Sequence, residues 1–172
     1  MKTKYLLIAM MAISTAAFAE VKRSEVKKPE EKKCLLDNGI VVHGSKRQLL
    51  VCEKNKPIYE FKVALGTNGL GKQKTGDRKT PLGLYTLGQP RKSGKFGMFI
   101  PIKYPTLAQR VSGYTGTHVG IHGPHWQFKS KTELNTSRDW TQGCIALGNE
   151  QIIKTISQWV ATHPNTRVLI TA

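Results

Sequence analysis

The sequence has few acidic residues, few cysteines and almost no long apolar segments. Among its 172 residues, 11 Asp and Glu stand against 27 Lys and Arg, which gives a formal charge of +16 at pH 7. After residue 20, no apolar run approaches the roughly 20 residues that a membrane-spanning helix needs. We therefore expect no stable membrane insertion beyond that point. The basic excess favours an acidic partner, and lysines that only maintain solubility are the alternative.

Several catalytic signatures are also missing. No pair of histidines has the spacing of a zinc site, and no Gly-x-Ser-x-Gly elbow of a serine hydrolase is present. Residues Gly66 to Lys72 have the glycine spacing of a phosphate loop, but Gln73 stands where that loop needs a magnesium-binding hydroxyl. We predict neither a metal nor a cofactor, and we interpret residues 66–80 as a basic loop beside a cleft.

Residues 1–19 have the composition of a secretory signal peptide. Lys2 and Lys4 precede an apolar run at residues 6–12, and Ala17-Phe18-Ala19 fits a cleavage site. We expect cleavage there and export to the periplasm. A membrane anchor is the alternative, but the apolar run is short. Cleavage lowers the formal charge from +16 to +14, because the removed residues hold two lysines and no acid.

An exported protein with this charge is expected to meet the cell wall as its acidic partner. Nucleic acid is not expected, because the aromatic residues do not alternate with basic ones as in a base-stacking surface. Residues 20–36 are mostly charged and are predicted to form a flexible tether. Residues 37–172 are long enough for a single domain with a hydrophobic core.

The three cysteines are an odd number for an oxidising compartment. The simplest arrangement pairs Cys34 with Cys52 and leaves Cys144 as a free thiol. Two separate buried thiols at positions 34 and 52 are the alternative. The paired arrangement is the one that a catalytic cysteine requires.

The predicted domain consists mainly of short strands. Alternating or β-branched residues predict strands at 39–43, 48–53, 58–65, 84–87, 96–102, 119–121 and 167–171, separated by turns that contain Gly or Pro. Apolar residues at helical spacing predict a helix that begins after Asn149 and ends at His163, and a short helix is expected at 106–111. The pattern predicts a mainly β domain with one or two helices, as a β-sandwich or partly closed barrel.

The stretch from residue 117 to 147 contains the groups that thiol acyl-transfer chemistry requires. An apolar strand leads into Ile121-His122-Gly123, and Gln142-Gly143-Cys144 later places a cysteine beside a glycine. We predict Cys144 as the nucleophile and His122 as the base that ionises it. Gly143 lets the backbone bend, so that N–H groups near the cysteine can stabilise an oxyanion. A buried, unreactive thiol is the alternative for Cys144.

The other histidines are assigned supporting roles. His118 is predicted to lie in the strand that delivers His122 and to face the same way, supporting the cleft rather than reacting. His125 follows the next turn and is a candidate for substrate contact. His43 and His163 lie at the ends of predicted elements and are interpreted as structural.

Four segments occur in an order that is specific to one family. They are Val63-Ala64-Leu65-Gly66, Gly76-Asp77-Arg78-Lys79-Thr80-Pro81-Leu82-Gly83-Leu84-Tyr85, Ile121-His122-Gly123 and Thr141-Gln142-Gly143-Cys144-Ile145, after an opening strand at 47–51. Together they resemble the L,D-transpeptidase catalytic domain, the YkuD family, over residues 41–171. The resemblance implies a YkuD-like β-rich fold and an exported enzyme that acts on peptidoglycan stem peptides.

The resemblance also implies a mechanism. The Cys144 thiolate attacks the carbonyl between an L-centre and a D-residue, and a terminal D-alanine leaves, with His122 as the base and then the acid. The Gly123 carbonyl orients the imidazole, and the N–H groups of Gly143 and Cys144 are candidates for the oxyanion hole. The thioester passes to an amine, which yields a cross-link or an attached lipoprotein, or to water, which yields a shortened stem.

Two positions depart from the commoner family pattern. Gln142 stands where that pattern has a His, and Ala146 stands where it has an Arg two residues after the cysteine. Arg138 or Arg110 is expected to replace the contact of the missing Arg. The residues that we assign to substrate contact are His125, Arg138, Trp140 and Thr141.

Three functions remain open on this basis. The first is a cysteine L,D-transpeptidase. The second is a hydrolase of the same linkages, either an L,D-carboxypeptidase or an amidase that releases peptidoglycan-bound protein. The third is a non-catalytic module that binds the wall through its positive charge and has no use for Cys144.

Overall fold

The computed structural model describes residues 34–172 with the exception of residue 130. The predicted signal peptide and all but the last three residues of the predicted tether lie outside these residues. Cys34 is 6% exposed and Leu36 packs against a buried cluster. The folded part therefore begins before residue 37, because the disulfide and this packing attach residues 34–36 to the domain.

Short strands make up most of the described chain. In order, the elements are β1 (Gly39–His43), β2 (Gln48–Glu53), β3 (Lys56–Ala64), β4 (Gly83–Thr86), β5 (Arg91–Ser93), β6 (Gly97–Pro101), α1 (Leu107–Val111), β7 (Gly120–His122), the 3-10 helix η1 (Trp126–Phe128), α2 (Thr132–Asn135), β8 (Ile145–Leu147), α3 (Glu150–Thr162) and β9 (Arg167–Thr171).

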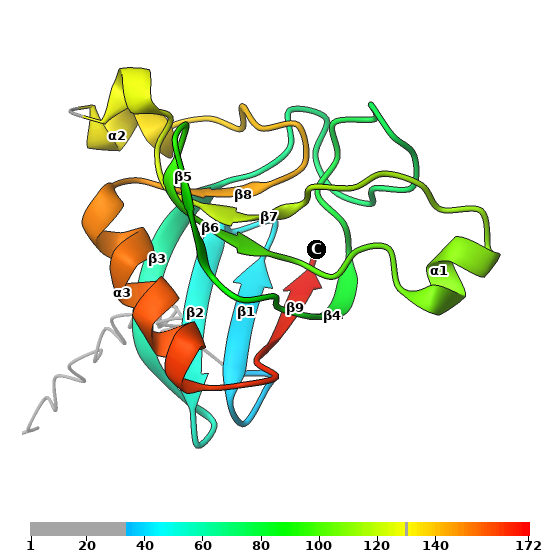
Figure 1. The fold of residues 1–172 in the computed structure, drawn as a ribbon, viewed down its shortest axis with the longest axis horizontal. Coiled ribbons are helices and arrows are strands. Elements are labelled where there is room, and N and C mark those ends of the chain that lie inside the picture. Colours follow the sequence, from blue (N-terminus) through cyan, green and yellow to red (C-terminus); the bar gives the residue numbers. More distant parts are fainter. Residues whose placement is uncertain (1–33, 130) are drawn as a thin grey trace, which may run out of the picture. The chain divides into compact units, whose positions relative to one another are not determined.

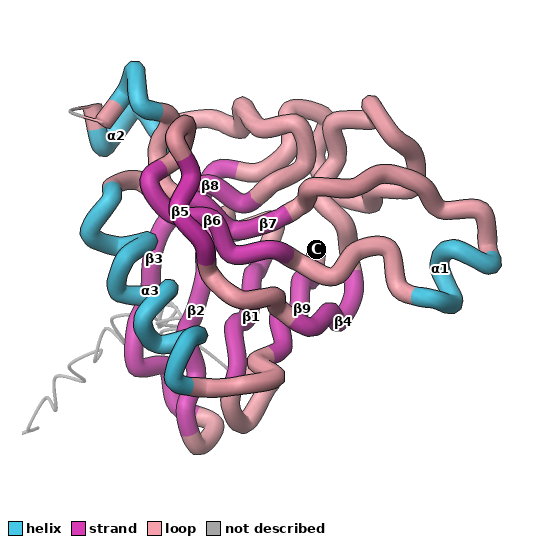
Figure 2. Tube along the Cα trace, in the orientation of Figure 1, coloured by secondary structure: helices cyan, strands magenta, loops and turns pink. Residues whose placement is uncertain are grey.

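The strands form one nine-stranded sheet with the order β4-β9-β1-β2-β3-β8-β7-β6-β5. Strand β3 joins its two halves, since its first part pairs with β2 and its last two residues, Val63 and Ala64, pair with β8. Strands β6, β7 and β8 run across β1 and β2 rather than along them, so the sheet is curled (Figure 1). Figure 2 shows that long loops connect the strands on the side of β7 and β8. The fold is mainly β and partly closed, as predicted.

The main hydrophobic core lies inside this curled sheet. Residues Ile40, Val42 and Leu49 from the β1–β2 hairpin and Ile121 and Ile145 from β7 and β8 all belong to it. On the opposite face of the hairpin, a second cluster contains Cys34, Val41, Leu50 and Cys52. Period-2 alternation places neighbouring residues of a strand on opposite faces, so both clusters can form from the same two strands.

Helix α3 closes the core beside β6 and β8. Its buried face holds Ile153, Ile156, Trp159 and Val160, and the Asn149 side chain accepts a hydrogen bond from the backbone N–H of Ile152 as an N-cap. The predicted start and end of this helix are confirmed. Two short helices, α1 and α2, accompany it, of which only α1 was expected. Within the described residues, no helix has the length and apolarity needed to cross a membrane.

Candidate active site

Strands β7 and β8 bring the two sequence motifs together. They pair in parallel, with Ile121 opposite Ile145 and His122 opposite Ala146. Cys144 lies two residues before Ala146, and residues two apart in a strand share a face. Cys144 therefore reaches the same face as His122, beside Gly120. Two motifs about 20 residues apart in the chain meet because neighbouring strands carry them.

The imidazole of His122 is held on several sides. Its ring is 1% exposed and stacks on Phe96, with 3.9 Å between the ring centroids, and it meets the edge of Trp140 at 5.7 Å. Its Nδ1 lies 2.7 Å from the carbonyl oxygen of Gly123. Because a carbonyl only accepts, Nδ1 carries the proton and Nε2 is left with a free lone pair. This is the tautomer that a general base needs.

Burial lowers the pKa of His122 to about 4, against the smaller raising effect of the hydrogen bond to Gly123. The charge of a nearby histidine, His125, lowers this pKa further. His122 is therefore neutral at neutral pH. A neutral imidazole is ready to accept a proton, and no imidazolium is present to ionise the cysteine in advance.

Cys144 is the free cysteine among the described residues and is half-buried. Its Sγ lies 3.4 Å from the carbonyl oxygen of His118. Burial raises the pKa of the thiol, while the backbone N–H of Gly120 and the charge of Lys72 lower it. The resting thiol is therefore protonated. Proton transfer to His122 must accompany attack.

The disulfide predicted by the cysteine count is present. Cys34 and Cys52 are bonded, with 5.9 Å between their Cα atoms. This bond lies in the second cluster, on the other face of the β1–β2 hairpin from the main core. It removes the two other cysteines from competition with Cys144 for a partner.

The two motif glycines are required by close contacts. A Cβ on Gly123 would lie 2.6 Å from the carbonyl oxygen of Phe96. A Cβ on Gly143 would lie 2.6 Å from the carbonyl oxygen of Lys79. The φ of Gly143 is +121°, a positive value that residues with a Cβ rarely adopt. Both glycines let the backbone approach a neighbouring segment that supports the site.

The two N–H groups proposed for the oxyanion hole differ in the structure. The N–H of Gly143 donates to Oγ1 of Thr141 at 3.1 Å, so it is already occupied. The N–H of Cys144 has no hydrogen-bond acceptor among the described residues. Thr141 is 3% exposed, and its hydroxyl donates to the carbonyl of Cys144 at 2.7 Å. Its hydroxyl therefore shapes the cysteine turn, whereas the sequence predicted a substrate contact.

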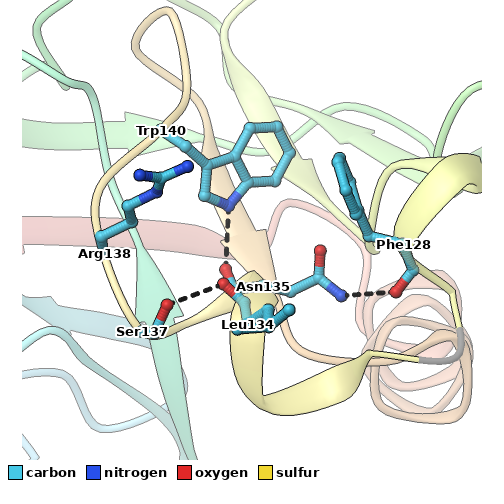
Figure 3. Close-up of a pocket in the computed structure, with 6 residues that line it drawn as sticks. All are labelled: Phe128, Leu134, Asn135, Ser137, Arg138 and Trp140. Carbon is cyan, nitrogen blue, oxygen red and sulfur yellow. Dashed lines mark hydrogen bonds between the residues drawn. The ribbon is translucent and has the colours of Figure 1, made fainter.

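A cavity of about 420 Å³ lies beside the site (Figure 3). Trp140 lines this cavity and also contacts the His122 ring, and it is anchored by a hydrogen bond of 2.8 Å from Nε1 to the carbonyl of Asn135. The walls are largely apolar, and the guanidinium of Arg138 lies alongside Trp140 (Figure 3). The residues that line the cavity are Phe128, Leu134, Asn135, Ser137, Arg138 and Trp140.

The remaining predicted residues lie near or away from the site. The ring of His125 meets the ring of Phe96 edge-on, with 5.8 Å between the centroids. Phe96 therefore contacts both His125 and His122. His118 precedes β7 with an exposed side chain and a φ of +62°, so its predicted place in the strand was wrong and only its carbonyl meets Cys144. Arg110 lies on the outlying helix α1 (Figure 1).

Phe96 and the Lys72–Asp77 pair are the residues of this region that sequence reasoning missed. Phe96 was predicted only as part of a strand, and nothing in its context indicated a stack on His122. Lys72 is 5% exposed, and its Nζ lies 2.7 Å from Oδ1 of Asp77. Asp77 belongs to the Gly-Asp-Arg-Lys-Thr-Pro motif and was therefore visible in the sequence, but its pairing with Lys72 was not. Among the described residues, no three His, Cys, Asp or Glu residues cluster as metal ligands.

The chain matches the model of the L,D-transpeptidase catalytic domain, YkuD, over residues 37–170. It is 27% identical over 131 residues to YafK of Escherichia coli (strain K12), whose name assigns it provisionally to the L,D-transpeptidases. That match covers 69% of this chain and 53% of YafK.

Solved structures share the fold. The helical cell shape determining protein Pgp2 from Campylobacter jejuni superposes with a TM-score of 0.62 and 28% identity, covering 80% of this chain and 49% of Pgp2. An L,D-transpeptidase mutant from Enterococcus faecium has a TM-score of 0.54 and 19% identity, covering 79% of this chain and 50% of that chain, and supports the fold alone. This chain spans about half the length of these relatives. By the family match over most of its length, the chain belongs to the L,D-transpeptidase catalytic domain (YkuD) family.

Proposed function

We propose that this protein is a periplasmic cysteine acyltransferase that acts on peptidoglycan stem peptides through a Cys144 thioester. One observation carries the proposal: a neutral, buried His122, fixed through Nδ1 to the Gly123 carbonyl, shares a strand face with a free, half-buried thiol. A non-catalytic wall-binding module has no need for this arrangement.

The first step forms the thioester. As Sγ of Cys144 attacks the carbonyl carbon, Nε2 of His122 takes the thiol proton, and the oxygen becomes an oxyanion. In this proposal the N–H of Cys144 donates to that oxygen. When the C–N bond breaks, His122 returns the proton to the leaving amine, and the acyl group stays on sulfur.

The second step depends on the acceptor. An amine that attacks the thioester loses a proton to His122 and yields an amide, as a cross-link or an attached protein. Water in the same place yields a carboxylate, which makes the enzyme an L,D-carboxypeptidase or an amidase. The same residues serve both outcomes, so hydrolysis is the alternative result of one site.

Substrate recognition is assigned to the cavity beside Trp140. Its apolar walls suit aliphatic side chains, and the Arg138 guanidinium suits a carboxylate of the stem peptide. Ala146, where the commoner pattern has an Arg, is fully buried in β8 and supplies no charge. Arg138→Gln is expected to raise KM about tenfold with little change in kcat, because a charged contact contributes roughly 1.5 kcal/mol.

Muropeptide analysis tests the proposal. Purified wild-type protein is incubated with tetrapeptide muropeptides, with and without a D-amino acid as acceptor, and compared with Cys144→Ala and Cys144→Ser. We expect a thioester mass on wild type, and cross-linked, exchanged or shortened products that both variants lack. A His118→Gln variant, changed at an exposed side chain, controls for folding. If the folded wild type forms no thioester and no product, the enzymatic proposal is lost and the binding module is favoured.

A further inference from the structure

Lys72 is a buried cation that the mechanism above does not use. The side chain is 4% exposed, and its ammonium group contacts Oδ1 of Asp77 at 2.7 Å and the carbonyl of Lys74 at 2.9 Å. A lysine ammonium is almost never buried unless it is paired, because desolvation of the charge is costly. The loop from Gly66 to Thr80 therefore contains a buried lysine that is held by an ion pair.

Asp77 holds this ion pair in a fixed geometry. Besides Lys72, its carboxylate accepts hydrogen bonds from the backbone N–H groups of Gln73, Lys74 and Lys79, at 2.8, 2.9 and 3.2 Å. Partial burial raises the pKa of Asp77, but these donors together hold it well below its usual range. The carboxylate stays ionised, and three backbone donors hold it in place as the partner of the Lys72 ammonium.

The stem of Lys72 lies next to the cysteine turn. A Cβ on Gly143 would lie 3.7 Å from Cδ of Lys72, and a Cβ on Gly116 would lie 2.9 Å from its Cε. Gly116 thus leaves space that this side chain occupies, and the stem lies at ordinary contact distance from the Gly143 position. Cys144, the nucleophile, directly follows Gly143 in the chain.

The groups around Cys144 can be named from each neighbouring element. Strand β7 and its approach supply neutral His122 and the carbonyl of His118. The loop 66–80 supplies Lys72, whose ammonium contacts Asp77. Of these groups, Lys72 carries the positive charge, and that charge favours the ionised form of the Cys144 thiol.

We propose that Lys72 is a positioning residue whose fixed ammonium stabilises the negative charge on Cys144 during attack, and that Asp77 holds it there. The claim that Lys72 aids catalysis rests on the function proposed above. The test below does not, because it measures the reactivity of the Cys144 thiol and not enzymatic turnover.

The test is the rate at which iodoacetamide alkylates Cys144 between pH 7 and pH 10.5, read by mass spectrometry. Lys72→Met is expected to react about tenfold more slowly at pH 8, since loss of a neighbouring charge raises a pKa by about one unit. The ratio of the two rates should narrow towards the highest pH, because the wild-type thiol approaches full ionisation first. Lys72→Arg should stay near wild type, as should Lys74→Met, which removes an exposed charge from the same loop.

Each other result overturns the proposal. A lower rate by one constant factor at every pH shows altered access, which a purely structural role explains. An unchanged rate in folded Lys72→Met shows that the charge does not act on the thiol. If Lys72→Met does not fold, Lys72→Gln decides, because it removes the charge but keeps a polar donor for Asp77. Its alkylation at pH 8 should again be about tenfold slower than that of wild type, and an unchanged or faster rate refutes the inference.

Discussion

The buried imidazole of His122 makes stability depend on pH in a calculable way. In the unfolded chain this histidine titrates near pH 6.5, whereas in the folded protein its pKa is about 4. Between these values the unfolded state binds a proton that the folded state does not. Stability therefore falls as the pH is lowered from about 6.5 towards 4, and is fully retained above 6.5.

The two pKa values give the size of this loss of folding stability. At pH 5 an unfolded His122 is almost fully protonated and the folded one almost fully neutral, so the linkage relation gives a loss of about 2 kcal/mol relative to pH 8. Because the side chain is 1% exposed, solvent screening does not reduce this figure. Such a loss is a large part of the 5–15 kcal/mol that is typical of domains.

Urea denaturation at pH 8 and pH 5 measures the effect. His122→Gln removes the titrating group and keeps a side-chain donor for the Gly123 carbonyl, so wild type should lose about 2 kcal/mol more than this variant. His118→Gln, at an exposed histidine, should keep the wild-type dependence. Equal losses in wild type and His122→Gln, or an NMR titration of His122 with a midpoint near 6.5, would refute the reasoning.

Further predictions concern the cysteine turn and the disulfide. Gly143→Ala should destabilise the protein by about 3 kcal/mol, from a disfavoured φ and a backbone overlap. Gly71→Ala, with a φ of +84° and no atom within 4 Å of its Cβ, should cost only about 1 kcal/mol in urea denaturation. Equal costs would contradict the predicted overlap. Thr141→Val should lower the thioester-forming rate about tenfold, because the Cys144 turn loses two hydrogen bonds. A wild-type rate would show that this hydroxyl does not shape the turn. Replacing Cys34 and Cys52 by Ser should lower the unfolding free energy by about 3 kcal/mol, from the entropy of a closed loop with 18 residues of separation. That variant should keep the alkylation rate of Cys144, and a changed rate would link the bond to the site.

Local patterns in the sequence were sufficient for much of the fold. The alternation in β1, β2 and β9 and the cap and apolar spacing of α3 each act over a few residues, so their bounds could be predicted. Strand β5, with the residues Arg91-Lys92-Ser93, has no apolar face and forms because β6 offers it an edge. No local signal marks such a strand.

The sequence by itself determined the chemical groups: a free Cys144, a His122 before a glycine, and the motifs that identify the family. Tertiary structure decided their state, because burial is set by segments far apart in the chain. Phe96 and Trp140 enclose the imidazole and make it neutral, and the stem of Lys72, which pairs with Asp77, lies next to the cysteine turn. Spacing along a chain identifies a nucleophile and a base, but solvent exclusion and neighbouring charge decide where their proton lies.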